Sequence, residues 1–203
     1  GNLFSQIPSA SATTYGIAFN TISIVGIGTE NKVVNNLIYN FNGGQGTHVG
    51  VNLSSAPYTK LYHNTIAFDD AVGSSSSITG LNINTTNVGQ ELKNNIFYIT
   101  RGSSNVSGSR CISNSAGSGT LISNGNDFYI TNSDGSYEIV TGFGTGLSSW
   151  QGAGYDVLSK NVDPFFTNPS LINYSPNNGV LDGAALAIGI VDDINNSPRS
   201  LTT

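Results

Sequence analysis

The chain has 203 residues, a formal net charge of −5 at pH 7 and only seven basic side chains. Charged residues make up 9% of it, against roughly 25% in an ordinary globular protein. We therefore expect no nucleic-acid partner, because binding to phosphates needs a surface rich in Lys and Arg. No apolar run approaches the ~20 residues of a membrane-spanning helix, so membrane insertion is not expected either. Cys111 is the only cysteine, which excludes a disulfide framework and a thiolate metal centre.

Two short phrases alternate along the chain and predict its strands. The first phrase occupies residues 16–19, 50–53, 80–83 and 110–113. The second phrase occupies residues 33–39, 61–67, 92–98 and 123–129. Its shared Asn recurs at steps of 28, 31 and 31 residues, at Asn36, Asn64, Asn95 and Asn126. A repeat of this length is typical of a solenoid, in which each unit stacks on the next and buries a continuous core.

Side chains alternate with period two on both sides of the repeated Asn, as in strands that bury one face. In the first phrase, the alternation points Leu81 inward and Asn82 outward. Aligning residues 110–113 with residues 80–83 points Cys111 inward and Ile112 outward in the same way.

The repeated Asn lies where the alternation turns a corner. Asn tolerates the left-handed backbone conformation better than most residues, and its amide can bond to the copy one rung away. We therefore expect a structural corner ladder, formed by Asn36, Asn64, Asn95 and Asn126.

Each unit of about 30 residues then carries at least two strands, which pair in parallel with their equivalents in the next unit. The predicted fold class is an all-β parallel β-helix. Residues 1–142 are expected to form the coils, and residues 143–203 the last coil and a short C-terminal cap of the same single domain.

The Asn-centred phrase resembles the repeat of right-handed parallel β-helix proteins, the pectate-lyase-like family. Residues 161–166, 174–176, 188–194 and 198–199 resemble the C-terminal closure of β-helix segments in large secreted surface proteins, including those of gliding bacteria that use the type IX secretion pathway. Residues 146–151 fit a short helical cap that carries the only Trp. The resemblance implies a right-handed coil and a secreted or cell-surface location. The partners that it implies are the secretion machinery and neighbouring domains of a larger chain.

Polysaccharide-degrading enzymes of this family need clustered acids on the outer face of adjacent strands. Asp127 is the one acid at the aligned outward positions, and no Lys or Arg joins it. We therefore assign no catalytic residue and expect a non-catalytic adhesive, binding or spacer module. The alternative is a polysaccharide lyase or glycoside hydrolase of the same fold, because one architecture serves enzymes and adhesins alike.

Asp69 and Asp70 follow a strand directly and are the candidates for a calcium contact. Adjacent side chains on a strand point apart, so the two can share an ion only on an irregular loop. The alternative is solvated loop charge. No other cofactor is expected.

Tyr39, Tyr98 and Tyr129 share one outward slot, which Ala67 interrupts. Aromatic faces can stack on sugar rings, so these residues are the candidates for binding a polysaccharide or another surface ligand. The alternative is that the rings pack on each other or under a loop. If the tyrosines bind nothing, the loops are the next place to look, starting with Asp69, Asp70 and the Ser-rich connection at residues 73–77.

Overall fold

The computed structural model describes residues 1–6, 12–22, 26–41, 46–70, 77–84, 88–101, 108–115, 121–131 and 137–199, and these form three parallel sheets. Sheet A contains β1 (Leu3–Gln6), β4 (Leu37–Phe41), β7 (Thr65–Phe68), β10 (Ile96–Ile99) and β13 (Asp127–Ile130). Sheet B contains β2 (Thr14–Asn20), β5 (Thr47–Ser54), β8 (Ser77–Ile83), β11 (Ser109–Asn114) and β14 (Tyr137–Val140). Sheet C contains β3 (Lys32–Val34), β6 (Lys60–Tyr62), β9 (Gln90–Lys93) and β12 (Leu121–Asn124).

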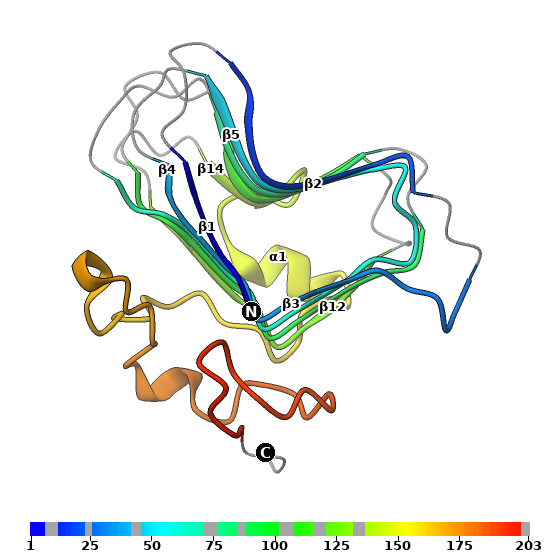
Figure 1. The fold of residues 1–203 in the computed structure, drawn as a ribbon. Coiled ribbons are helices and arrows are strands. Elements are labelled where there is room, and N and C mark those ends of the chain that lie inside the picture. The colour runs from blue at the N-terminus through cyan, green and yellow to red at the C-terminus, as the bar shows by residue number, and fades with distance from the viewer. Residues whose placement is uncertain are drawn as a thin grey trace.

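The three sheets wind into a right-handed parallel β-solenoid, which confirms the predicted fold class. Each strand pairs with its equivalent one coil later; Thr65 of β7 faces Ile96 of β10, which faces Asp127 of β13. Viewed from the N-terminal end, the chain runs clockwise through sheets A, B and C as it recedes from the viewer (Figure 1).

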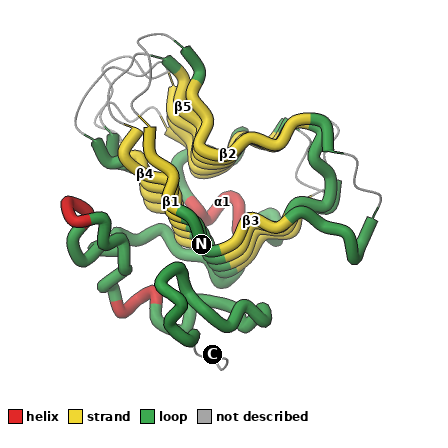
Figure 2. Tube along the Cα trace, viewed as in Figure 1, coloured by secondary structure: helices red, strands yellow, loops and turns green. Residues whose placement is uncertain are grey.

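The cross-section is bent rather than round. Figure 2 shows sheets A and C diverging from a shared corner, while sheet B bends to follow both of them. The core therefore has two arms, one between sheets A and B and one between sheets B and C.

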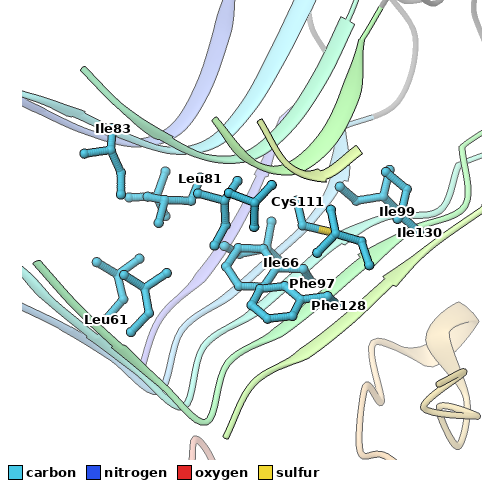
Figure 3. Packing of buried hydrophobic residues seen from close by; sticks show 14 of the residues in the cluster. Leu61, Ile66, Leu81, Ile83, Phe97, Ile99, Cys111, Phe128 and Ile130 are labelled. Carbon is cyan, nitrogen blue, oxygen red and sulfur yellow. The ribbon is translucent and has the colours of Figure 1, made fainter. Parts of the chain in front are cut away.

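Columns of identical or similar side chains fill the core (Figure 3). Ile66, Phe97 and Phe128 stack along sheet A, and none of them is exposed to solvent. The rings of Phe97 and Phe128 are parallel to within 17°, with centroids 5.3 Å apart. Burial of each such side chain stabilises the fold by about 1.5–3 kcal/mol. Packing of the columns therefore favours the repeat length that keeps equivalent residues in register.

The predicted alignment of β11 is wrong by one residue. Ile112 pairs with Leu81 and Ser113 with Asn82, so Cys111 lies opposite Gly80. Both Cys111 and Ile112 are completely buried, whereas Ile112 was expected to face outward. A Cβ added at Gly80 would come within 2.6 Å of the Phe97 ring, so this slot of sheet B faces sheet A, where Figure 3 shows Cys111 close to Ile66 and Phe97. Two consecutive residues can therefore both be buried where sheet B bends.

Helix α1 (Leu147–Gly152) closes the C-terminal end of the solenoid, which confirms the predicted cap. The Trp150 ring is fully buried between Tyr155, stacked at 4.1 Å, and Phe143, edge-on at 4.7 Å. Its indole N–H donates to Asp156 Oδ2 at 2.6 Å.

The chain continues beyond the cap and runs along the outside of the solenoid. Residues 160–199, here called the C-terminal strap, include the short 3-10 helices η2 (Pro169–Leu171) and η3 (Gly179–Leu181) and return along the outside of the solenoid toward its first coil (Figure 1). No helix in the described part of the chain is long and apolar enough to cross a membrane.

Candidate functional site

The C-terminal strap is fixed to sheet A and its corner by hydrogen bonds spread over successive coils. At the last coil, Lys160 forms a parallel bridge with Asp127. One coil earlier, Leu186 exchanges two bonds of 2.8 Å with the amide of Asn94. Near the first coil, Asn35 donates to the Asp192 carbonyl at 2.7 Å. The strap therefore ties the coils together from outside.

The left-handed residue of each corner is the one before the repeated Asn, not the Asn itself as the sequence suggested. The backbone φ is +56° at Asn35, +53° at His63, +58° at Asn94 and +69° at Gly125. This conformation suits Asn and Gly because they tolerate positive φ at low cost. It directs the side chains of Asn35 and Asn94 outward, where they hold the strap.

The four repeated Asn residues lie at one buried corner and bond in series. The side-chain amide of Asn36 donates to Asn64 Oδ1 at 2.9 Å, and Asn64 donates in the same way to Asn95. Asn95 donates to Asn126 at 3.0 Å. Each acceptor oxygen also receives the backbone N–H of the preceding Asn. The corner ladder thus satisfies buried backbone and side-chain groups together, as buried polar atoms require.

The tyrosines of the outward slot pack on each other and beneath the strap. The Tyr98 and Tyr129 rings stack at 5.5 Å, and Phe166 of the strap meets Tyr98 edge-on at 5.0 Å. Tyr174 lies 5.0 Å from Phe166 and 5.8 Å from Tyr39. Burial raises the pKa of Tyr98 and Tyr129, with the charge of Asp163 adding to the shift. The aromatic column is therefore a docking surface for the strap.

The side chains of Asp69 and Asp70 bind different partners. Asp69 accepts a 2.9 Å hydrogen bond from the Tyr174 hydroxyl, whereas Asp70 pairs with the buried guanidinium of Arg101 at 3.2 Å. Arg101 also donates to the Phe41 carbonyl at 2.7 Å. Burial raises the pKa of Asp69. Within the described residues, no group of three or more His, Cys, Asp and Glu could hold a metal ion. Of the Ser-rich connection, only Ser77 lies within the described residues.

A groove of about 640 Å³ lies between the strap and the outer face of sheet A. Its floor is a single outward column, formed by Leu3, Leu37, Thr65 and Ile96 of four successive strands. The strap supplies one wall, which includes Ile172, Tyr174 and Pro176. The rest of the lining is mostly polar and includes Asn35, His63 and Asn94 at the corner and Asp193 and Arg199 of the strap.

The polar lining of the groove is neutral at the corner and charged at the strap. Burial, with a smaller effect of the Arg199 charge, lowers the pKa of His63 to about 4. His63 is therefore neutral near pH 7, and its imidazole can both donate and accept a hydrogen bond. Arg199 donates to Asn35 Oδ1 at 3.0 Å, and burial lowers its pKa without neutralising it. Such a mixture suits a polar, uncharged ligand with apolar faces.

The outward column of the groove floor continues into Asp127, which the strap covers completely. Asp127 Oδ1 accepts the Val162 N–H at 3.1 Å, while Oδ2 is buried with no hydrogen-bond partner. The side chain is 3% exposed, and burial, aided by the negative charge of Asp163, raises its pKa to about 7. The strap therefore both binds the Asp127 carboxyl group and shields it from solvent.

We expect Asp127 to make the protein more stable in mild acid. Because its pKa is raised in the folded state, its contribution is fully present below the unfolded pKa of about 4 and is lost as the pH rises through about 7. Asp127→Asn should raise the free energy of unfolding at pH 8 by roughly 1–3 kcal/mol and flatten its pH profile. Urea titrations between pH 4 and pH 8 measure this, with the exposed Asp182→Asn as control. An unchanged profile in Asp127→Asn would contradict the assignment.

The features that sequence reasoning missed all involve the strap: the groove, Tyr174, Arg199 and the outward residue of each corner. Only the corner residue left a local signal, since Asn or Gly precedes the repeated Asn in three of the four copies. Fold and site together define a parallel β-solenoid with a strapped outer face and a groove beside the corner. Comparison of the chain with protein-family models, with curated proteins and with solved structures finds no match.

Proposed function

We propose that this chain is a non-catalytic β-solenoid module that binds a glycan in the groove beneath the strap. The observation that carries the proposal is the lining of the groove, where an apolar floor faces the Tyr174 ring and amide groups line the corner. Sugars present apolar ring faces and hydroxyl edges, and pockets of a few hundred Å³ with this mixture are typical of small-ligand sites.

The state of the acids supports binding over catalysis. A glycosidase needs two carboxyl groups that flank the scissile bond, and a lyase needs an accessible base. Asp69 is bound by Tyr174, Asp70 by Arg101, and Asp127 is covered by Val162. Asp193, which lines the groove, accepts the backbone N–H groups of Asn195 and Ser197, and none of these three acids lies beside it in the lining. The raised pKa of Asp127 is the one feature that favours the alternative, a polysaccharide lyase or hydrolase. Its burial argues against that alternative.

The finer assignment rests on the sequence resemblance. We propose that the module belongs to a large secreted or cell-surface protein of the pectate-lyase-like β-helix type, exported by the type IX pathway of gliding bacteria. The Asn-centred repeat and the closure motifs at residues 161–199 support this proposal. In such a protein the module acts as an adhesive or spacer segment beside other domains.

The groove can be tested by filling it. Thr65 lies at the middle of the floor with its side chain outward, so Thr65→Trp should occupy the groove without touching the core. We expect a glycan bound by the unmodified protein, found by screening neutral and acidic oligosaccharides by calorimetry, to lose at least about tenfold in affinity. Ile122→Trp is the matched control, because Ile122 is 58% exposed on sheet C and lies outside the groove.

The same oligosaccharide screen distinguishes binding in the groove from binding elsewhere and from enzymatic turnover. Equal affinity of Thr65→Trp and the unmodified protein would place binding elsewhere, and Tyr129→Ala then tests the aromatic column. New reducing ends or unsaturated sugar products, formed with calcium present and abolished by Asp127→Asn, would replace the binding function with an enzymatic one.

A further inference from the structure

The corner ladder is terminated at one end of the solenoid and open at the other. At the C-terminal end, Asn126 donates its backbone N–H to Ser159 Oγ at 2.8 Å and its side-chain amide to Asp156 Oδ1 at 3.0 Å. These two groups replace the acceptor that a further Asn would supply. At the N-terminal end, Asn2 donates to Asn36 Oδ1 through its backbone and its side chain, at 3.2 and 3.1 Å. Among the described residues, nothing donates to Asn2 Oδ1.

The apolar core is open at the same end. Phe4 pairs with Ile38, Ile17 with Val51, and the same column arrangement continues along the sheets. Ile38 and Val51 are completely buried, whereas Phe4 and Ile17 of the first coil are only partly covered. At the opposite end, Trp150 and Leu147 of α1 seal the core. The first coil therefore presents uncovered apolar side chains and the unpaired edges of β1, β2 and β3.

We propose that the N-terminal end is a docking edge for one further parallel β-coil, joined on the N-terminal side of Gly1, that carries Asn in the corner slot. The open acceptor at Asn2 needs two donors in one place, a backbone N–H and a side-chain amide, as each Asn of the ladder supplies. Asp and Ser cannot supply both, because neither carries a side-chain amide.

Chain direction fixes the source of this coil. Strand β3 of sheet C runs into the corner, where Asn35 and Asn36 lead into β4. Gly1 and Asn2 stand in the places of Asn35 and Asn36 one coil earlier. A sheet C strand that enters the corner therefore connects directly to Gly1.

A second copy of the protein does not fit the edge. Two N-terminal ends placed face to face would set acceptor against acceptor at Asn2. An N-terminal end placed on a C-terminal end would meet α1, where Ser159 and Asp156 already terminate the ladder. The hydrogen bonds of the ladder all run in one direction along the solenoid. Only a coil of the same handedness and chain direction can therefore extend it.

A fusion of the chain with its own coil tests the edge. Residues 64–93 placed directly ahead of Gly1 put the copied Asn64 at 31 residues from Asn2, the spacing found between Asn64 and Asn95. We expect hydrogen–deuterium exchange at the amides of β2 to slow by about tenfold or more in the fusion. The denaturant m-value should rise, because one cooperative unit then exposes more surface on unfolding.

Two variants separate docking from a passive extension. Asn2→Ala in the fusion should remove most of the added protection of β2, whereas in the unextended protein it should leave β2 exchange unchanged. Changing the copied Asn64→Asp should have the same effect as Asn2→Ala, because it removes the side-chain donor. Equal exchange of β2 with and without the added coil would overturn the proposal. A dimer of the unextended protein in light scattering, lost on Asn2→Ala, would also overturn it in favour of a second copy.

Discussion

Asn95→Val is expected to lower the free energy of unfolding by about 2–4 kcal/mol. The Asn95 side chain donates to the Leu61 carbonyl at 2.9 Å and to Asn126 at 3.0 Å, and its oxygen accepts two bonds from Asn64. Val has similar bulk but no polar atoms, so it leaves the buried Asn64 N–H without its acceptor and removes the side-chain donor to the Leu61 carbonyl and to Asn126 Oδ1. A buried polar group left without a partner costs about 1–3 kcal/mol. Urea unfolding followed by circular dichroism measures the change.

The end of the same ladder provides the control. Asn2 is exposed and makes its two bonds at the open edge, so Asn2→Ala should cost the unextended protein less than about 1 kcal/mol. Backbone strain plays no part in this comparison, because the left-handed residues are Asn35, His63 and Asn94 rather than the repeated Asn. If both substitutions had equal effects, the ladder would not depend on burial.

Trp150→Ala is expected to cost about 3–5 kcal/mol, the range found when large buried aromatic residues are truncated. Trp150 is the largest fully buried side chain and fills the end of the core between Phe143 and Tyr155. Its removal opens a cavity under α1 and leaves the buried Asp156 Oδ2 without its indole donor. Thermal unfolding followed by far-ultraviolet circular dichroism measures the loss, since the substitution also removes the only Trp fluorophore.

Trp150→Phe separates the two contributions. Phe retains the stacking on Tyr155 but lacks the N–H donor, so it should cost about 1–3 kcal/mol, mainly through Asp156. The cap should detach before the coils in Trp150→Ala, giving early amide exchange in β13 and β14. Uniform exchange along all strands would instead show that cap and coils unfold as one unit.

The sequence alone determined the repeating part of this protein. The Asn step of 28 or 31 residues and the alternation around it fix which residues stack, because a parallel coil places equivalent positions one above another. The fold class and the positions of the buried columns follow from that rule, whereas the helical cap at residues 146–151 was predicted from the resemblance to the closure of other β-helix segments. The one-residue error at Cys111 arose because a bend in sheet B buries two neighbours, which strict alternation does not allow.

Tertiary structure alone decided what lies outside the coil. The strap is not part of the repeat, and many of its contacts with the coils join residues far apart in the sequence; Leu186 and Asn94 are 92 positions apart, and Arg199 and Asn35 are 164 apart. No local sequence pattern predicts such pairings, because they depend on the path that the strap takes across the outer face of the folded solenoid. That path covers the tyrosine column, buries Asp127, engages Asp69 through Tyr174 and leaves the groove beside the corner.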